Sequence, residues 1–460
     1  MTDFVGYNEW AARTLGVAIA TDFVYEQEPN GDRGVFIAED VAPHTEVFSV
    51  PLDSLLTVRA LHAAEAPHPL AQLAFFRHCD ADCEDDQLAL ALLYETHVAR
   101  AASRWSEHLA RLPRRYSNVL FFRGRALRRL RGSNLFFIAQ QMQRKVADDY
   151  AALRARAIEP LVAALLRDGG GGCGLSRAEL DTGFSLERYK WALSTVWSRF
   201  VSLRVAADGS VSDADEPSGS PSDFFGMARV KAMVPVFDML NHDPEAEMAH
   251  FLDLASQRFK LVSHQHWAAG SQMFINYGAL SNHKLLALYG FVLEHNPFDA
   301  LDVWLPMDPA TASRFADKAA LLAANGLEHA TAPFELAADE LNELLLIAVR
   351  IQEIECGSSE ELRALAAKAL DGEVLSVANE HATLTRLIYT LQKMLEEFGD
   401  DDDNDDDNGD DNGDNGDSED ESERTRHERM AAVVRRSDQT ILAETIEMLK
   451  WELLQILPTP

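Results

Sequence analysis

The residues best suited to chemistry lie in two short stretches. The first, VFDMLNH, places Asp238, Asn241 and His242 at the end of an apolar run. The second, FINYG, places Tyr277 just before a segment with helical periodicity. Carboxylate, amide, imidazole and phenol groups together offer donors and acceptors that can bind a polar ligand and orient a reacting group.

Each stretch also has a purely structural interpretation. A buried polar group left without a hydrogen bond costs about 1–3 kcal/mol. Asn241 and His242 could therefore cap a turn while Asp238 holds a neighbouring loop. A single tyrosine such as Tyr277 at a strand end is usually a packing residue. The presence of both stretches, in this order, favours a site.

The surrounding segments should place both stretches at strand ends. Alternating apolar and polar residues predict strands within 20–60. Strand patterns return at 229–237, 247–263 and 272–276. Ser281 is suited to be a helix N-cap, and the helix NHKLLALYG should end at Gly290.

Helical periodicity dominates much of the remaining chain. DDQLALALLYETHVARAA has an acidic first turn and an apolar stripe, as a helix requires. Further helices are predicted at 134–167 and 185–200, and in the segment after residue 308. This order indicates a mostly β unit split by a helical insertion and followed by a separate helical domain.

The chain of 460 residues carries a formal net charge of −32, and the charge is unevenly placed. Residues 399–423 contain 15 acidic residues, no basic residue and no hydrophobic residue. Such a tract cannot bury a core, so we expect a disordered acidic insertion between two helices. An acidic surface suits contact with basic protein segments.

Several functional classes fit this sequence poorly. No apolar run reaches the ~18 residues of a membrane-spanning helix. The start, MTDFVGYNEW, lacks the basic residues and apolar core of a secretory signal. We therefore expect a cytoplasmic or nuclear protein that does not enter membranes. The lack of a basic footprint argues against direct nucleic-acid binding.

Cysteine and histidine residues do not form a metal-binding pattern. Cys79 and Cys83 lie close together beside His78, but the other two cysteines are distant. A structural zinc site needs about four ligands, and no second pair is present. HQH at 264–266 offers two ligands without a third. We expect no bound metal and free thiols rather than disulfides.

The two polar stretches, read as FDMLNH and NYGALSNHKLLALYGFV with the following HNPFD, resemble a known family. The chain is similar to SET-domain protein methyltransferases of the Rubisco large-subunit lysine and actin-histidine class. Supporting matches are GDRGVFIAEDV, LALALLYE, WSEHLARLP and FSLERYKWALSTVWSRF. The C-terminal AAVVRRSDQTIL resembles the family's substrate-binding domain, so the resemblance covers nearly the whole chain.

This resemblance implies an α+β fold of SET type, in which a threaded loop brings the two polar stretches together. The SET domain would comprise an N-terminal part at 1–110, a mostly helical insertion at 111–228 and a C-terminal part at 229–299. An all-α substrate-binding-like domain would follow at 300–460, and it would contain the acidic insertion.

The resemblance also implies roles for single residues. Tyr277 matches the catalytic tyrosine, and Arg199 matches an arginine near the cofactor carboxylate, which suits its charge. GDR departs from the acidic-Gly-apolar pattern usual at the first cofactor turn. The implied cofactor-binding residues are Gly31, Asp32, Arg33, Arg199, Asp238, Asn241, His242, Tyr289 and Phe291. The implied substrate-binding residues are Leu203, Asp238, Phe251, Tyr277 and Tyr289.

The implied cofactor is S-adenosylmethionine, whose sulfonium methyl is already electrophilic, so neither a metal nor a covalent nucleophile is needed. A lysine acceptor must be neutral. Its pKa is about 10.4, so deprotonation near pH 7–8 costs roughly 3–5 kcal/mol. Tyr277 would orient the amine in line with the methyl group and the sulfur.

The implied substrate is a non-histone protein. In actin-histidine members an Asn lies two residues after the motif arginine, and a Trp precedes the motif aspartate. Val201 and Phe237 occupy these positions here and offer neither amide nor indole to an imidazole. Lysine is therefore the expected target, with histidine as an alternative. A further alternative is a catalytically inactive SET-fold binding protein. We expect a monomer.

Overall fold

The computed structural model divides into two compact units. Unit 1 comprises residues 1–116 and 143–279, and unit 2 comprises residues 117–142 and 280–460. The described residues are 4, 6–27, 33–62, 68–77, 83–167, 174–206, 227–253, 255–327, 333–338, 340–399 and 421–456. The four-part domain division predicted above stays a prediction, and the two compact units group the chain differently.

Some predicted features lie outside the described residues. They are Gly31 and Asp32 of the expected cofactor turn, His78 and Cys79, and residues 400–420 of the acidic tract. Across the described part of the chain, no helix is both long and apolar enough to span a membrane.

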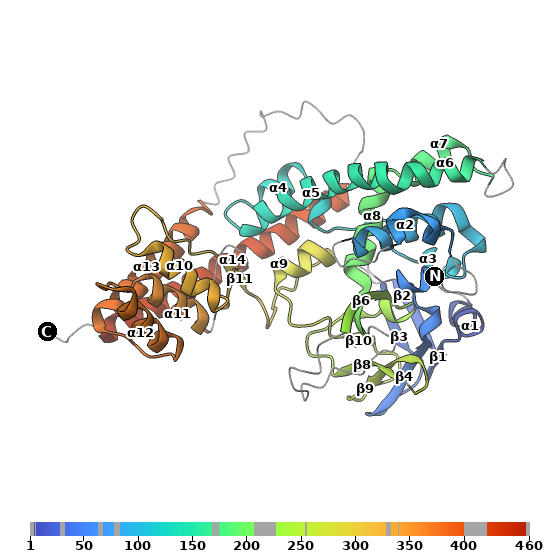
Figure 1. Ribbon diagram of the computed structural model, residues 1–460. Coiled ribbons are helices and arrows are strands. Elements are labelled where there is room, and N and C mark those ends of the chain that lie inside the picture. The colour runs from blue at the N-terminus through green and yellow to red at the C-terminus, as the bar shows by residue number, and fades with distance from the viewer. Residues whose placement is uncertain are drawn as a thin grey trace. The chain divides into compact units, whose positions relative to one another are not determined.

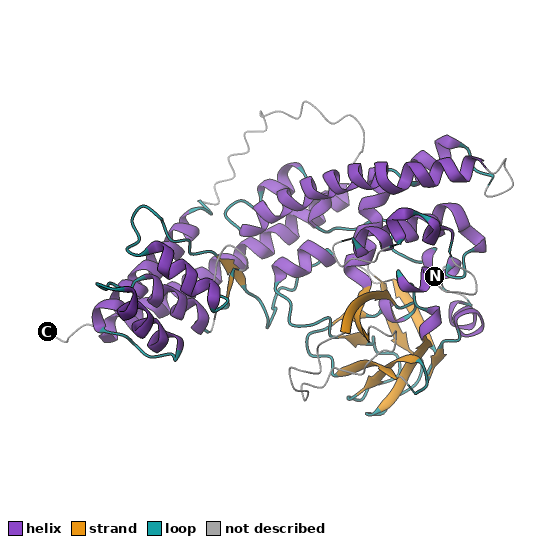
Figure 2. Ribbon diagram, in the orientation of Figure 1, coloured by secondary structure: helices purple, strands orange, loops and turns teal. Residues whose placement is uncertain are grey.

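Unit 1 contains the main β-structure (Figures 1 and 2). Its four-stranded sheet has the order β1 (Ala18–Ile19), β4 (Thr45–Pro51), β9 (Arg258–Ser263) and β8 (Met248–Asp253). Three two-stranded sheets pair β2 (Phe23–Gln27) with β3 (Arg33–Ile37), β5 (Phe200–Ala206) with β6 (Met227–Met233), and β7 (Asn241–His242) with β10 (Phe274–Ile275).

The helices of unit 1 include those of the predicted segments 85–102, 134–167 and 185–200, together with short helices that were not predicted. They are α1 (Tyr7–Trp10), α2 (Glu84–Tyr94), α3 (Ser106–Leu109), α6 (Glu159–Arg167), α7 (Arg177–Gly183) and α8 (Leu186–Arg199), while α5 (Asn134–Leu153) has residues in both units. β9 shows the alternation of buried and half-buried residues expected of a strand with one face in the core.

Helix α2 lies in the core of unit 1 and accepts hydrogen bonds from α8. Its apolar residues are buried all round, as expected for a helix inside a domain. Its acidic first turn complements the positive end of the helix dipole. There Asp86 accepts a hydrogen bond from the Tyr189 hydroxyl at 2.5 Å, and Asp85 accepts one from Trp197 Nε1 at 3.0 Å. Both donors belong to α8, whose last residue is Arg199.

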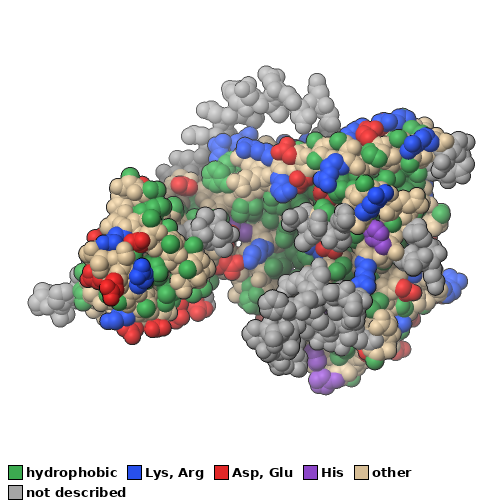
Figure 3. Space-filling model, viewed as in Figure 1, with side chains coloured by type: hydrophobic (Ala, Val, Ile, Leu, Met, Phe, Trp, Pro, Cys, Tyr) green, Lys and Arg blue, Asp and Glu red, His purple; other side chains and the backbone are tan. Residues whose placement is uncertain are grey.

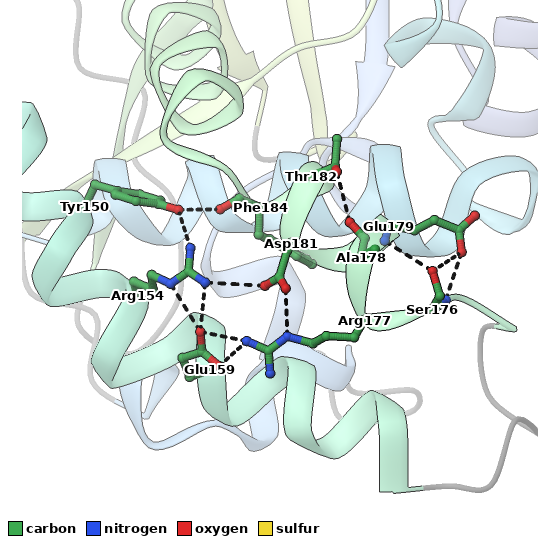
Figure 4. Close-up of polar contacts among 10 residues, drawn as sticks. All are labelled: Tyr150, Arg154, Glu159, Ser176, Arg177, Ala178, Glu179, Asp181, Thr182 and Phe184. Carbon is green, nitrogen blue, oxygen red and sulfur yellow. Dashed lines mark hydrogen bonds and ion pairs between the residues drawn. The ribbon is translucent and has the colours of Figure 1, made fainter.

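A network of ion pairs joins the helices that precede α8 (Figure 4). Arg154 contacts Glu159 at 3.1 Å and Asp181 at 3.3 Å, and Arg177 contacts the same two carboxylates at 2.8 and 2.9 Å. Basic and acidic side chains lie next to one another over α6 and α7 in Figure 3. Exposed pairs of this kind contribute little to stability because solvent screens them. Their effect is to keep α7, and hence the start of α8, against α6.

The strand predicted at 229–237 is shorter than expected, because β6 ends at Met233. Pro235 has no N–H to continue the ladder, and Val236 then takes a φ of 74°. The chain next forms a 3-10 turn at Phe237–Met239. Asp238 therefore lies in this buried turn rather than at a strand end, whereas Asn241 and His242 form β7.

Unit 2 is mainly helical. Its elements are α4 (Gly124–Arg128), α9 (Asn282–Lys284), β11 (Leu301–Val303), α10 (Phe315–Ala324), β12 (Phe334–Leu336), α11 (Glu343–Gln352), α12 (Ser359–Leu370), α13 (Val377–Glu396) and α14 (Glu421–Ile456). Leu384, Leu387 and Leu391 of α13 share one apolar core with Ile441 and Leu442 of α14. The two helices that flank the acidic tract in sequence are thus packed elements of unit 2.

Two details of the C-terminal prediction are wrong. The region expected to be all-α contains the antiparallel pair β11 and β12, in which Leu301, Val303, Phe334 and Leu336 turn their side chains into the core. The acidic tract was expected to run to Glu423, but α14 begins at Glu421. Acidic side chains are stabilised in the first turn of a helix, which explains the earlier start.

Helix α9 continues into a π-helical turn at Leu285–Tyr289, and Gly290 ends it as expected. Its φ is 81°, a left-handed conformation that glycine adopts without strain, and an added Cβ would lie 2.8 Å from the backbone nitrogen of Asn118. We expect Gly290→Ala to lower the free energy of unfolding by about 2–3 kcal/mol, since it combines backbone strain with a clash. Urea denaturation measures this loss.

Gly326 provides the matched control. It also ends a helix with a positive φ, 69°, but an added Cβ there would meet no described atom within 4 Å. Gly326→Ala should therefore show only the conformational cost, about 1 kcal/mol. Equal losses for the two variants would show that the close approach to Asn118 contributes nothing.

Candidate active site

The two polar stretches lie side by side in unit 1. Strands β7 and β10 pair in parallel, with Asn241 opposite Phe274 and His242 opposite Ile275. The Asp243 N–H continues the pairing by donating to the Ile275 carbonyl at 3.1 Å. This short pairing brings Tyr277, which follows β10 by two residues, next to the segment that ends at His242.

Tyr277 is held at three points. Its hydroxyl donates to the Leu240 carbonyl at 2.7 Å, and its backbone N–H donates to His242 Nδ1 at 3.1 Å. The rings of Tyr277 and His242 stack with centroids 5.0 Å apart. Burial lowers the pKa of His242, which keeps the imidazole neutral near pH 7 and leaves Nδ1 able to accept. The phenol is therefore fixed against the backbone of the VFDMLNH stretch.

Arg199 lies against the same stretch. A terminal nitrogen of its guanidinium donates to the Asp238 carbonyl. Burial acts to lower the pKa of Arg199, but Tyr116, Asp238 and Tyr277 act to raise it, and the net shift is upward. The Nε atom is buried and has no hydrogen-bond partner among the described residues. A fixed cation thus lies beside Tyr277, and its Nε donor can serve a ligand.

Asp238 presents the opposite charge. It is 7% exposed, and its Oδ2 accepts from His108 Nε2 at 3.1 Å. His108 Nδ1 in turn contacts the Tyr7 hydroxyl at 2.7 Å. Asp238 Oδ1 is buried without a hydrogen-bond partner in the described part of the chain. The carboxylate is therefore oriented through one oxygen while the other stays available.

Asn241 has a structural role in addition to its predicted role in cofactor binding. Its side-chain nitrogen donates to the Arg33 carbonyl at 2.7 Å and to Gln272 Oε1 at 3.1 Å. An amide nitrogen has two hydrogens, so both are used. Within the side chain, only the amide oxygen remains for a ligand. Arg33 itself donates to the Arg111 carbonyl at 2.5 Å, which leaves the start of β3 fixed on both sides.

The other predicted site residues are less closely connected. Leu203 is a buried residue of β5 opposite Val230, and Phe251 on β8 is 37% exposed opposite Lys260. Tyr289 and Phe291 belong to unit 2, where their rings meet edge to face at 6.2 Å. The predicted binding roles of all four stay predictions.

Sequence reasoning did not predict roles for Tyr7, His108 or Tyr116. His108 lies within WSEHLARLP, a stretch that supports the family resemblance, but a histidine on a short helix carries no signal of its own. Tyr7 is near the start of the chain, far from both polar stretches in sequence. Neither position could be assigned before the contacts with Asp238 were known.

The arrangement suits a zwitterionic ligand. Buried polar atoms are costly unless they form hydrogen bonds, so two such atoms without protein partners are suited to contact a polar ligand. Arg199 Nε can donate to an anionic group, and Asp238 Oδ1 can accept from a cationic group. The amino-acid end of S-adenosylmethionine carries one of each. Among the described residues, no cluster of three or more His, Cys, Asp or Glu side chains could hold a metal ion.

Comparison with known proteins identifies the class of fold. Residues 309–442 match the Rubisco LSMT substrate-binding family. The structure of the LSMT SET domain bound to methyllysine and AdoHcy has a TM-score of 0.69 at 17% identity and covers 99% of this chain and 93% of that one. The Rubisco LSMT structure bound to AdoMet gives 0.68 at 18% identity, with 99% and 93% covered. The fold is therefore that of a SET-domain methyltransferase.

The curated relatives include enzymes for two different targets. Actin-histidine N-methyltransferase of Drosophila melanogaster is 28% identical over 54% of this chain and 44% of its own length. Ribosomal lysine N-methyltransferase set10 of Schizosaccharomyces pombe is 24% identical over 78% of this chain and 58% of its own. The chain thus spans about half the length of these relatives. Together the matches confirm the resemblance to SET-domain methyltransferases of the Rubisco and actin-histidine class.

Proposed function

We propose that this protein is an S-adenosylmethionine-dependent protein methyltransferase that modifies a lysine side chain of a non-histone protein. The observation that carries the proposal is the cluster of Arg199, Asp238 and Tyr277, in which a buried donor and a buried acceptor lack partners among the described residues beside a fixed phenol. The two structural neighbours named above were solved with AdoMet or AdoHcy, which supports the same cofactor here.

The residues of the cluster have separable tasks. Arg199 would bind the cofactor carboxylate through Nε, and Asp238 would accept from its ammonium group through Oδ1. When bound, the cofactor supplies an electrophilic methyl group. Asn241 would act mainly by fixing the backbone around the site, because both of its amide hydrogens are already used.

Tyr277 would orient the acceptor. Its hydroxyl hydrogen is directed to the Leu240 carbonyl, so an amine would meet the oxygen lone pairs rather than the hydrogen. A phenol held at three points can fix the acceptor nitrogen in line with the transferred group without competing as a nucleophile. Such positioning raises the rate only if the tyrosine does not move, which its contact with His242 favours.

A protein substrate is supported by the match of residues 309–442 to a substrate-binding family. Lysine is favoured because Val201 and Phe237 occupy the positions at which histidine methylators carry an amide and an indole. The Phe237 ring is also committed to packing, with the Phe259 ring at 5.0 Å and the His250 ring at 5.4 Å. It could not turn toward a substrate without opening this core.

Histidine is the second candidate target. The observation in its favour is the similarity to actin-histidine N-methyltransferase over 254 residues. Incubating a cell lysate with the protein and isotopically labelled S-adenosylmethionine, followed by mass spectrometry, separates the targets. Label on lysine supports the proposal, label on histidine supports the second candidate, and label that also appears without added protein counts for neither.

Cofactor binding provides a direct test of the site. We expect Arg199→Ala to weaken S-adenosylmethionine binding by roughly 1–3 kcal/mol, because one charge-assisted contact is lost. Isothermal titration calorimetry measures the change. The control is Arg154→Ala, which removes an arginine from the α6 and α7 ion-pair network and should leave the affinity unchanged. Equal affinity for wild type and Arg199→Ala would place the cofactor elsewhere.

A further inference from the structure

A buried chain of hydrogen bonds leads from the N-terminal helix to Asp238. Tyr7 of α1, His108 of α3 and Asp238 are 1%, 2% and 7% exposed. The Tyr7 hydroxyl lies 2.7 Å from His108 Nδ1, and His108 Nε2 lies 3.1 Å from Asp238 Oδ2. Tyr7 and His108, which lie far from Asp238 in the sequence, are thus linked to the Asp238 carboxylate of the candidate site.

The chain has one arrangement of hydrogens that satisfies every member. A carboxylate can only accept, so His108 Nε2 carries a hydrogen and donates to Asp238. With the ring hydrogen on Nε2, Nδ1 is left to accept from the Tyr7 hydroxyl. Burial raises the pKa of Tyr7, with Tyr25 and Asp238 adding to the increase, so the phenol keeps its hydrogen. Because the Asp238 carboxylate can only accept, each hydrogen bond in the chain points from Tyr7 toward Asp238.

The backbone next to Asp238 is strained. Val236 is fully buried and has φ 74° and ψ −51°, a conformation that is a rare outlier for a β-branched residue. Strain of this kind persists only where surrounding contacts impose it. A backbone hydrogen bond from the Val236 N–H acts to lower the pKa of the Tyr7 phenol, against the larger effect of burial. Tyr7 therefore contacts the turn both through His108 and directly.

Tyr7 itself is firmly held. Its ring packs edge-on against Phe4 at 5.7 Å and against Tyr25 at 5.4 Å. The Arg111 guanidinium lies over the Tyr7 ring at 5.0 Å. A cation over an aromatic face is attracted by the ring and adds to this packing. The hydroxyl of Tyr7 can therefore act as a fixed point for the residues beyond it.

We propose that Tyr7 and His108 are positioning residues that hold the Asp238 carboxylate so that Oδ1 meets the ammonium group of S-adenosylmethionine. The inference rests on the proposed function, since it assigns the ligand of Asp238 within that site. His108 fixes Oδ2, which leaves Oδ1 as the acceptor for the ligand. Tyr7 fixes His108 and supports the strained turn.

The test is a double-mutant cycle on cofactor affinity, measured by calorimetry with S-adenosylmethionine on the full chain. We expect Tyr7→Phe and His108→Phe each to weaken binding about tenfold, and His108→Gln, which keeps a donor, to restore most of the loss. In an Asp238→Asn background, His108→Phe should cause no further loss, because the group through which His108 acts is already altered.

Tyr25→Phe is the matched control. It removes a hydroxyl from the same aromatic cluster, but that hydroxyl donates to Asn8 at 3.1 Å rather than to His108. Its affinity should equal that of the wild type. Melting temperatures of all variants identify any loss caused by unfolding, and Tyr7→Phe keeps the ring if His108→Phe does not fold.

The outcomes separate the inference from the function on which it rests. If the wild type does not bind S-adenosylmethionine, the proposed function fails. If the wild type binds and Arg199→Ala weakens binding, while Tyr7→Phe and His108→Phe bind normally, only the inference is overturned. The inference is also overturned if the losses of His108→Phe and Asp238→Asn simply add, since that is the behaviour of independent structural defects.

Discussion

Tyr277→Phe should lower methyl transfer by about two orders of magnitude while leaving S-adenosylmethionine affinity within a few-fold of the wild type. The hydroxyl is the only group removed, and it is the group that would orient the acceptor while its hydrogen is held by the Leu240 carbonyl. Loss of one positioned polar group commonly costs about 10²–10³ in rate. Single-turnover transfer to a substrate protein identified from a lysate, with calorimetry alongside, measures both quantities.

Tyr150→Phe is the control for this loss. The Tyr150 hydroxyl also donates to a backbone carbonyl, that of Phe184, at 2.8 Å (Figure 4). Both variants therefore lose a bond to a backbone carbonyl, and Tyr150→Phe also loses the bond that its hydroxyl accepts from Arg154 at 3.1 Å, so the control removes at least as many contacts. Turnover of Tyr277→Phe within threefold of the wild type would exclude the orienting role, and an equal loss in Tyr150→Phe would indicate a general effect on stability.

Asp438→Ala should lower the free energy of unfolding by about 3–5 kcal/mol, the cost of removing one partner from a buried charge pair. Asp438 of α14 accepts from His283 Nε2 of α9 at 2.8 Å, and Ser133 lies 3.3 Å from the same nitrogen. All three residues are buried within unit 2. Urea denaturation monitored by circular dichroism gives the value.

Two further variants show what the charge contributes. Asp438→Asn keeps the shape and an acceptor oxygen, so its loss should be smaller than that of Asp438→Ala. Glu447→Gln breaks an exposed pair with Lys450 on the same helix and should change stability by less than about 0.5 kcal/mol. A loss for Asp438→Ala no larger than that of Glu447→Gln would show that the pair with His283 is not structural.

The same pair should make stability depend on pH. Burial lowers the pKa of His283, but Asp438, Asp299 and Asp302 raise it more, and the net shift is upward from 6.5. A raised pKa in the folded state stabilises the fold fully below the unfolded value, near 6.5. This contribution is lost as pH rises through the folded value. The stability difference between wild type and Asp438→Asn should therefore shrink above pH 6.5, and a difference that grows would contradict the direction of the shift.

The local features of the site could be predicted from the sequence because each has a short-range cause. The alternation within β9 and the periodicity of α13 and α14 reflect which face of each element is buried. Ser281 accepts from the Lys284 N–H, and Gly290 takes a positive φ, so both helix ends lie where their residue types indicate. The polar residues Asp238, His242 and Tyr277 were identifiable because they interrupt apolar segments.

Local causes also explain where the structure differs from the prediction. The strand expected through 237 ends at Met233, because Pro235 and the strained Val236 interrupt the ladder within an apolar run that periodicity alone cannot divide. The cofactor-binding role of Asn241 stays a prediction, and its amide hydrogens bind the Arg33 carbonyl and Gln272. A side chain's type indicates which bonds it can make, and its neighbours in space determine which bonds it makes.

Only the tertiary structure could connect residues distant in the chain. The bonds from Tyr7 to His108, from His108 to Asp238 and from His283 to Asp438 span 101, 130 and 155 residues. Separations of this length leave no periodic signal in a single sequence, since any of many polar residues could occupy the partner position. The sequence by itself thus determined the longer helices, several of the strands, the two polar stretches and the family resemblance. Packing decided which oxygen of Asp238 is held and which remains available, because a buried carboxylate takes its orientation from the donors that the fold brings to it.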